Sequence, residues 1–198
     1  MIERQLVLPT KPSIIAITGM PGARKTAVAR RLSSYNMPYF TLSDVLRKEL
    51  ISQGLALSPR NFAKLAKRWR GRFGQDVMAR RLWASITSPI AVVDGLRSTA
   101  ELDFFRSVAG RFTLVLVHAS PATRFRRFRR RRHPYLSTLP GFQAQEKSNL
   151  DAGIGNVIAQ ADYVLINEGY SGHSLSEQVD QLLDFLQKKG WQIPPAKK

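Results

Sequence analysis

The sequence contains no cysteine and only three histidines. Without cysteine, the chain cannot form a disulfide, a thiolate metal site or a cysteine nucleophile. The histidines, His118, His133 and His173, are scattered along the chain and lack the spacing of metal ligands. These absences exclude thiol enzymes and zinc-finger-type domains, and they favour a cytoplasmic protein.

The sequence also lacks a long hydrophobic run. No apolar segment approaches the roughly 20 residues that a membrane-spanning helix needs. Residues 1–12 carry charges and prolines instead of the apolar core of a signal peptide. We therefore expect no membrane partner. The 198 residues suffice for one domain with a sizeable core, which we expect at 13–189 between loose tails at 1–12 and 190–198.

Acidic residues are scarce: 14 stand against 31 Lys and Arg, for a formal net charge of +17. Such a surface attracts polyanions, and nucleic acid is the usual one. An arginine-rich thermophile surface and a phosphate-handling enzyme with many cationic ligands are the alternatives. Residues 60–72 are a basic stretch with helical spacing, either a solvated face or a binding face. The arginine run 124–132 suits a mobile cationic lid that closes on a phosphoryl group.

Strands and helices alternate along the chain, which indicates an α/β domain with a mostly parallel sheet. The candidate strands are the apolar runs 14–18, 38–41, 90–94, 112–118 and 162–166. Most are continuously apolar, as is typical of strands covered on both faces. Helix starts are predicted by Ser58-Pro59, by Ser120-Pro121 and by the capping-box pair Ser98 and Glu101, and an apolar stripe over 175–186 predicts a last helix.

The most informative segment is Gly-Met-Pro-Gly-Ala-Arg-Lys-Thr at 19–26. It follows the predicted strand 14–18 and precedes a helix-like stretch at 27–35, which is the layout of a phosphate-binding loop. In such a loop the backbone N–H groups surround the phosphates, the lysine reaches the outer phosphates and the threonine ligates Mg²⁺. We therefore predict that ATP and Mg²⁺ bind at Gly19, Met20, Pro21, Gly22, Ala23, Arg24, Lys25 and Thr26.

Arg24 stands where the usual pattern has a second glycine. A glycine there lets the backbone approach the phosphates and adopt angles that other residues resist. The arginine side chain can point to solvent, lie along the phosphates as a further cation, or spoil the pocket. A plain strand–turn–helix with incidental Gly22 and Lys25 is the alternative, and it fits poorly because Lys-Thr has the correct offset from Gly19 and from the strand.

Two carboxylates follow other predicted strands. Asp94 ends the strand 90–94, at the edge where open α/β sheets bind ligands, so it can hold Mg²⁺ or its water shell, and Arg97 can meet a second phosphate. The alternative is a simple turn. Asp44 and Arg47 lie three residues apart on one helical face after the second strand. The alternative there is that Ser43 or Asp44 only caps the helix.

The motifs together resemble the nucleoside-monophosphate kinase group of P-loop kinases, and most nearly an archaeal family of adenylate-kinase-related and dephospho-CoA-kinase-like proteins. The resemblance covers about 14–170. It rests on Ile-Thr-Gly-Met-Pro-Gly-Ala, Leu-Ser-Asp-Val-Leu-Arg, Val-Val-Asp-Gly-Leu-Arg-Ser, Val-His-Ala-Ser-Pro-Ala-Thr-Arg-Phe, Gly153-Ile-Gly155 and Ala161-Asp-Tyr-Val-Leu-Ile-Asn167-Glu-Gly. It implies a three-layer P-loop NTPase sandwich with a five-stranded parallel sheet, a helical acceptor-binding segment at about 42–86 and an arginine-rich lid at about 124–150.

The resemblance also implies roles for single residues. The acceptor's phosphate would be bound by Arg47 and Arg97, and Asp44 matches an aspartate that dephospho-CoA kinases position to activate a hydroxyl. Lys25 and Asp94 would act in catalysis, the latter through the metal. The remaining predicted contacts are the lid arginines that clamp the phosphoryl group, Arg124, Arg127 and Arg131, and the adenine-binding loop residues, Asn167 and Glu168.

Two functions from different classes follow. The first is a kinase that transfers the γ-phosphoryl group of ATP, with Mg²⁺, to a small phosphorylated acceptor. The second is a protein whose degenerate loop no longer turns over and which binds RNA or a ribonucleoprotein through its basic faces. A kinase that acts on a polynucleotide end would join the two. Arg24 departs from the family pattern as well, in which glycine is usual at this position.

Overall fold

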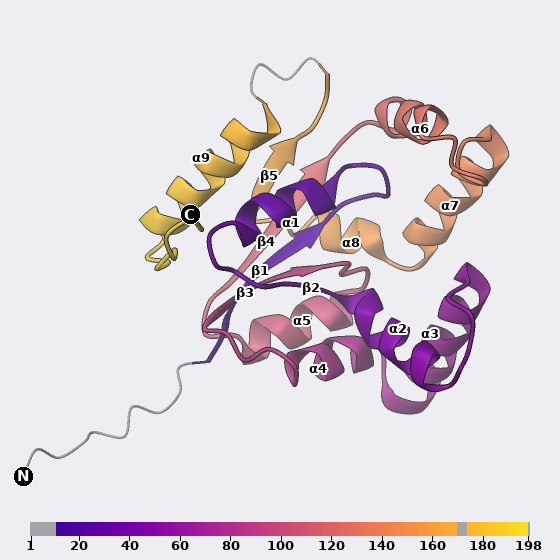
Figure 1. Cartoon of the computed structure of the whole chain (residues 1–198), viewed down its shortest axis with the longest axis horizontal. Helices are drawn as coiled ribbons and strands as arrows, with labels where there is room; N and C mark the ends of the chain where they lie inside the picture. Colours follow the sequence, from indigo (N-terminus) through magenta and orange to yellow (C-terminus); the bar gives the residue numbers. More distant parts are fainter. Residues whose placement is uncertain (1–10, 170–173, 198) are drawn as a thin grey trace, which may run out of the picture.

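The computed structural model describes residues 11–169 and 174–197 (Figure 1). Its centre is a five-stranded sheet of order β2-β3-β1-β4-β5, in which all neighbouring strands are parallel. The strands are β1 (Ser13–Thr18), β2 (Tyr39–Thr41), β3 (Ile90–Asp94), β4 (Phe112–His118) and β5 (Tyr163–Ile166). The predicted parallel α/β sheet is confirmed, and each strand lies within one residue of its predicted run.

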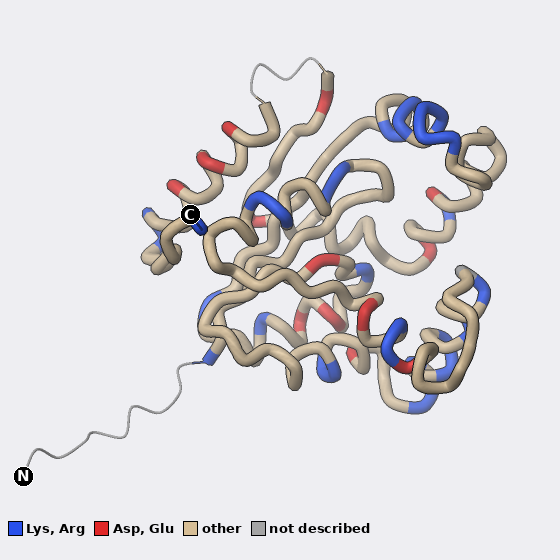
Figure 2. Tube along the Cα trace, viewed as in Figure 1, with Lys and Arg blue, Asp and Glu red and all other residues tan. Residues whose placement is uncertain are grey.

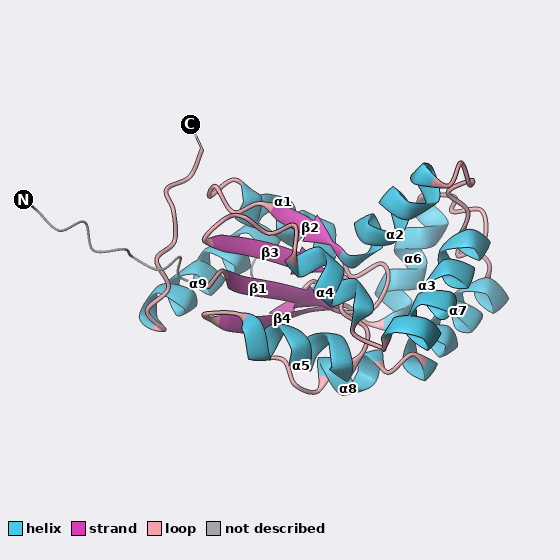
Figure 3. Ribbon diagram, turned by 90° about the horizontal axis from the view of Figure 1, so that it is seen from below, coloured by secondary structure: helices cyan, strands magenta, loops and turns pink. Residues whose placement is uncertain are grey.

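Helices cover both faces of this sheet. Their bounds are α1 (Lys25–Ser33), α2 (Leu42–Ser52), α3 (Pro59–Phe73), α4 (Val77–Trp83), α5 (Thr99–Val108), α6 (Pro121–Arg130), α7 (Leu139–Asp151), α8 (Ile154–Ile158) and α9 (Leu175–Lys188). Helices α1 and α9 pack on one face, whereas α4, α5 and α8 pack on the other (Figures 1 and 3). The result is the predicted three-layer sandwich.

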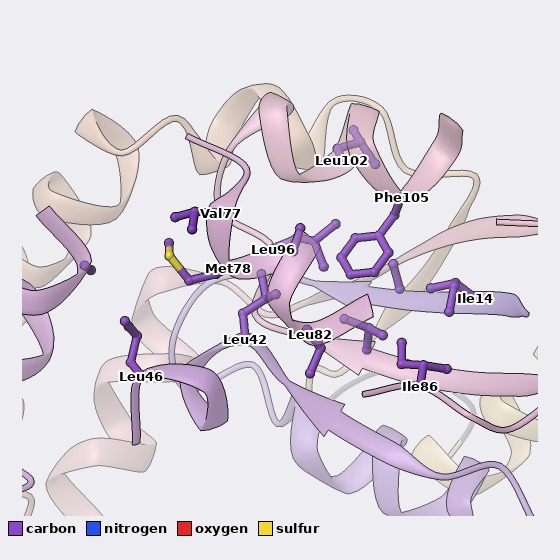
Figure 4. Close-up of a cluster of buried hydrophobic side chains, with 14 of the residues drawn as sticks. Ile14, Leu42, Leu46, Val77, Met78, Leu82, Ile86, Leu96, Leu102 and Phe105 are labelled. Atoms are coloured by element: carbon purple, nitrogen blue, oxygen red, sulfur yellow. The ribbon is translucent and has the colours of Figure 1, made fainter. Parts of the chain in front are cut away.

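Alternation along β1 explains why two cores form. Ile14 and Ala16 face the core shared with α2 to α5, while Ile15 and Ile17 face the core shared with α1 and α9. All four side chains are fully buried, because a strand covered on both faces has no solvent side. Figure 4 shows the first core, where Phe105 of α5 lies among aliphatic side chains.

The cap residues start the helices as predicted, with one difference. The Ser58 side chain accepts a hydrogen bond from the backbone N–H of Asn61, and the Ser120 side chain accepts one from that of Thr123. Each serine directly precedes a proline in the first turn of its helix. The hydroxyl of Ser98 accepts from the backbone N–H of Glu101 at 3.3 Å. The Glu101 carboxylate, however, accepts from the Arg97 backbone N–H at 2.9 Å instead of returning to Ser98. The predicted capping box is therefore only half formed.

The end of the chain is packed, so the expectation of a loose C-terminal tail is wrong for 191–197. Trp191 is buried in the core beside α9. The Asn36 side-chain amide donates to the Pro195 carbonyl at 3.0 Å, and the Lys197 backbone N–H donates to the Ser34 carbonyl. These contacts tie the segment to the end of α1. The expected tail at 1–12 lies outside the described residues up to residue 10.

The fold brings the carboxyl ends of the strands together at one end of the molecule. Helices α2, α3, α6 and α7 gather beyond these strand ends (Figure 3). In a parallel sheet this edge is where ligands bind. None of the helices within the described ranges is long and apolar enough to cross a membrane.

Candidate functional site

The loop between β1 and α1 depends on two glycines. Gly19 has a φ of 136°, and a Cβ there would lie 2.3 Å from the Val117 carbonyl oxygen. Gly22 has a φ of 87°, and its Cβ would lie 2.9 Å from the Phe128 ring. Both positions therefore require glycine, for backbone angle and for space. Phe128 belongs to α6, so the helix predicted to form the lid lies directly on this loop.

The carbonyl oxygens of the loop are turned toward side chains that hold them. Three such bonds are Lys25 Nζ to Gly19 O at 2.8 Å, Arg127 Nη1 to Gly22 O at 3.1 Å and Asn167 Nδ2 to Ala23 O at 2.9 Å. By contrast, the backbone N–H groups of Gly22, Arg24, Lys25 and Thr26 donate no hydrogen bond within the described residues. A loop with tethered carbonyls and free N–H groups before a helix is an anion-binding site.

Arg24 adopts the backbone conformation that a glycine would adopt. Its φ of 73° and ψ of 33° are left-handed, and it is the N-cap of α1 without a side-chain cap bond. A non-glycine residue in this region costs roughly 1 kcal/mol. The loop thus keeps its geometry in spite of the arginine. The exposed Arg24 side chain lies close enough to Arg127 to lower the pKa of that guanidinium, after the larger effect of burial.

Lys25 and Asp94 form an electrostatic pair at the edge of the sheet. Burial lowers the pKa of the Lys25 ammonium, and the nearby Asp94 carboxylate opposes that shift. Burial likewise raises the pKa of Asp94, which is only 7% exposed, and Lys25 opposes that shift. Arg97 and Arg124 also lie near enough to lower the pKa of Lys25. A cluster with this excess of positive charge favours an anionic ligand.

One oxygen of Asp94 has a partner and the other does not. The Tyr39 hydroxyl donates to Asp94 Oδ2 at 3.1 Å. Asp94 Oδ1 is buried and has no hydrogen-bond partner among the described residues. Burial and the Asp94 carboxylate raise the pKa of the Tyr39 phenol, and the neighbouring Thr26 side chain in the first turn of α1 opposes that shift. A buried carboxylate oxygen without a donor is suited to a cation or to a water that the cation carries.

Mg²⁺ fits this arrangement. Within the described ranges no group of three His, Cys, Asp or Glu could form an all-protein metal cage. Mg²⁺ usually keeps several waters and is held by one or two protein oxygens plus substrate phosphates. The Thr26 hydroxyl and the Asp94 carboxylate are the residues that would hold it.

Asp44 serves as a helix cap in this structure. Its carboxylate accepts from the Thr41 backbone N–H at 3.2 Å, and the Thr41 hydroxyl accepts from the Asp44 backbone N–H, which makes a capping box. Its other oxygen lies 3.4 Å from Arg47 Nε. The exposed Arg47 guanidinium also lies over the Phe62 ring of α3. The Arg97 side chain is exposed at the same strand edge, after β3.

The three predicted lid arginines have different environments. Arg124 is 3% exposed, donates to the Ala119 carbonyl and pairs with both carboxylate oxygens of Glu146 at 2.5 Å. It therefore joins α6 to α7, and its guanidinium is not free in this conformation. Arg127 holds Gly22 and also donates to the Asn167 carbonyl at 2.7 Å. Arg131 is exposed at the end of α6.

The predicted adenine-loop residues hold other parts of the protein. Asn167 links the P-loop to Arg127. Glu168 is buried and accepts hydrogen bonds from the Ser120 backbone N–H and the Thr123 hydroxyl, which lower the pKa of its carboxyl. Glu168 thus anchors the start of α6.

Sequence reasoning missed three residues of the site region, Tyr39, Glu101 and Glu146. Tyr39 lies in a predicted strand, where a tyrosine is ordinary, and nothing marks its hydroxyl as a partner of Asp94. Glu146 is one of only a few acidic residues near the arginine run, and that scarcity could have identified it as the partner of an arginine. Glu101 was read as a cap alone, although its buried carboxylate also pairs with Arg70 at 3.3 Å.

The chain is similar to known proteins over most of its length. The family model described as "AAA domain" matches residues 15–147. A UPF0200 protein of Hyperthermus butylicus is 37% identical over 181 residues, which span 89% of this chain and 96% of that protein.

Solved structures share the fold at low sequence identity. TT1252 from Thermus thermophilus has a TM-score of 0.62 and 22% identity, covering 92% of this chain and all of that one. The shikimate kinase of Aquifex aeolicus has a TM-score of 0.53 and 18% identity, covering 89% of this chain and 98% of that one. These likenesses show a P-loop kinase-like fold.

Proposed function

Because the chain belongs to the UPF0200 family and contains an AAA domain of the P-loop kinase-like kind, we propose that it is an ATP-dependent phosphotransferase. In this proposal it transfers the γ-phosphoryl group to a nucleotide-like acceptor. One observation carries the proposal: the loop backbone N–H groups of Gly22, Arg24, Lys25 and Thr26 donate no hydrogen bond among the described residues, while the loop carbonyls are tied to side chains. The neighbouring orphan oxygen of Asp94 supports Mg²⁺ as the partner of ATP.

Catalysis would consist of positioning and charge stabilisation, since phosphoryl transfer asks little covalent chemistry of the protein. The loop N–H groups would bind the β-phosphate, and Lys25 would leave the Gly19 carbonyl to reach the β- and γ-phosphates. Thr26 and Asp94 would hold Mg²⁺, which would supply charge neutralisation to the phosphates. Arg127 would sit beside the nucleotide because it already lies against the loop at Gly22.

The acceptor would bind at the carboxyl ends of β2 and β3. We assign Arg47 and Arg97 to its phosphate, within an acceptor-binding segment at about 42–86. Asp44 could take a hydroxyl proton only after its carboxylate releases the Thr41 N–H. The lid would span about 124–150, with Arg131 free to approach the phosphoryl group and Arg124 held by Glu146 until the lid rearranges. A dephospho-CoA or nucleoside-monophosphate acceptor and a cytoplasmic location belong to this proposal.

The experiment that tests the proposal compares Lys25→Met with Lys188→Met, an exposed lysine on α9. ATP–Mg²⁺ binding is measured by titration calorimetry, and folding by circular dichroism. Losing a charged hydrogen bond of about 1.5–3 kcal/mol should weaken ATP binding at Lys25 roughly 10- to 100-fold. The Lys188 variant should bind like the wild type. Equal affinity in the wild type and the Lys25 variant would refute the phosphate-loop assignment.

The second function raised by the sequence, a degenerate loop in an RNA- or ribonucleoprotein-binding protein, predicts a different outcome. Under that alternative, the wild-type protein shows little or no kinase turnover, and release of ADP does not depend on any acceptor. A coupled ADP assay with AMP and with dephospho-CoA therefore separates the two. Acceptor-dependent release that the Lys25 variant loses supports the kinase.

A further inference from the structure

Five of the six positive charges of α3 lie on one face of the helix, and the sixth, Arg70, pairs with Glu101. The side chains of Arg60, Lys64, Lys67, Arg68 and Arg72 are all exposed. Their spacing of four, seven, eight and twelve residues from the first places them on a single stripe. We call these five residues the α3 basic face. The opposite side of the helix carries Leu65, Ala66 and Trp69, which are buried in the core.

No carboxylate neutralises the α3 basic face. None of the ion pairs within 11–169 and 174–197 includes any of its five residues. Nearby acidic residues are already paired with other arginines, as Asp44 is with Arg47, Asp76 with Arg80 and Glu101 with Arg70. The face therefore carries about five uncompensated charges between Arg60 and Arg72, a distance of about 18 Å along the helix.

The charge is segregated, which argues against a uniformly basic surface made for solubility. Helix α9 carries several acidic residues (Figure 2), whereas α3 has none. The basic residues of α3 and α6 lie at the end of the molecule beyond the strands (Figures 2 and 3). A polyanion would thus find a dense group of basic side chains at this end of the protein.

The length of the face indicates the class of ligand. A single nucleotide cannot reach charges spread over about 18 Å, whereas one strand of a nucleic acid places a phosphate every few ångströms. An aromatic ring lies at the end of this face: Phe73, the last residue of α3, is 38% exposed. The guanidinium groups of Arg72 and Arg81 lie 5.1 and 5.6 Å from this ring's centre. An exposed ring flanked by cations is a platform for an unpaired base.

We propose that the α3 basic face binds single-stranded RNA, with the phosphodiester backbone along the helix and a base on Phe73. This inference goes beyond the proposed phosphotransferase, because it uses no residue of the P-loop. It therefore predicts that Lys25→Met binds RNA as the wild type does, so the two proposals can fail separately.

The test uses two triple variants that change the charge equally. Lys64→Gln/Lys67→Gln/Arg68→Gln removes three charges from the α3 basic face. The control, Arg30→Gln/Lys188→Gln/Lys189→Gln, removes three exposed charges: one on α1, one at the last residue of α9 and one at the residue that follows α9. Each variant lowers the formal charge from +17 by three. The probe is a fluorescein-labelled oligouridine of about 20 nucleotides, long enough for the face, read by fluorescence anisotropy at several salt concentrations.

The wild type and the control should bind the probe more tightly than about 10⁻⁴ M near physiological salt. The α3 variant should bind at least about tenfold more weakly, and the slope of log affinity against log salt should fall by about 2, since each lost phosphate contact contributes about 0.7. Phe73→Leu should weaken binding roughly tenfold with the slope unchanged, because stacking carries no counterion release.

Three results would overturn the proposal. Equal weakening in both triple variants would mean that only net charge matters. An unaffected α3 variant would place the RNA elsewhere. Wild-type protein that binds vesicles of phosphatidylserine and phosphatidylcholine, but not the oligouridine, would assign the face to an anionic lipid surface instead.

Discussion

Replacing Arg24 with glycine should stabilise the protein, although it removes a side chain and adds none. The reason is the backbone: Arg24 has a φ of 73° and a ψ of 33°. Glycine occupies this left-handed region without the steric cost that the arginine Cβ incurs. Glycine is also an acceptable N-cap residue, and Arg24 makes no side-chain cap bond that would be lost.

The size of the gain follows from two opposing effects. Relief of the left-handed strain contributes roughly 1–2 kcal/mol. The greater conformational freedom of glycine in the unfolded chain lowers the free energy of unfolding by about 0.4–1 kcal/mol. The net increase in the free energy of unfolding should be about 0.5–1 kcal/mol. For a chain of this length, that raises Tm by roughly 1–4 °C.

The assay is urea unfolding followed by circular dichroism, with Arg132→Gly as the matched control. Arg132 also has a positive φ, 49°, but it follows α6 and lies outside the P-loop. Both variants should gain stability by similar amounts. A destabilised Arg24→Gly beside a stabilised Arg132→Gly would refute the strain argument, because it would mean that the Arg24 side chain makes a stabilising contact.

The same pair of variants determines what the Arg24 side chain does. Its guanidinium lies near Arg127, so its removal takes one exposed cation from the mouth of the site. Exposed charges contribute about 0.2–1 kcal/mol, so ATP affinity should fall by at most about fivefold. Tighter ATP binding by Arg24→Gly, but not by Arg132→Gly, would contradict this and would show that the arginine obstructs the phosphates.

The fold could be predicted because its signals are local. Continuous apolar runs such as 90–94 and 112–118 form strands whose residues are mostly buried, and such runs alternating with helices are typical of a parallel sheet covered by two helical layers. The starts of the helices could be predicted for the same reason, since Ser58 and Ser120 cap helices through hydrogen bonds to residues only three positions away. The packing of 191–197 escaped prediction because it depends on Trp191 finding a core built by distant residues.

The site was less predictable, because its decisive contacts join residues far apart in sequence. The loop glycines Gly19 and Gly22 follow from a motif. Which of seven neighbouring arginines is buried does not, since Arg124 is set apart only by its pairing with Glu146, 22 residues away. The role of Glu168 was likewise hidden, because its hydrogen bond to Thr123 spans 45 residues.

Two further substitutions test the packing of the lid on the loop. Gly22→Ala should destabilise the protein by about 1–3 kcal/mol, because the added Cβ would lie 2.9 Å from the Phe128 ring at a position with a positive φ. The control is Gly71→Ala on α3, where the added Cβ meets open space. This variant should be more stable than the wild type by up to about 1 kcal/mol. Arg124→Met should cost about 3–5 kcal/mol in unfolding by urea, since it leaves the Glu146 carboxylate partly buried and unpaired. If that unpaired charge is the cause, Arg124→Met/Glu146→Met should recover most of the loss. A double variant as unstable as the single one would show that Arg124 stabilises the protein through packing and through its hydrogen bond to the Ala119 carbonyl before α6, and not through the ion pair.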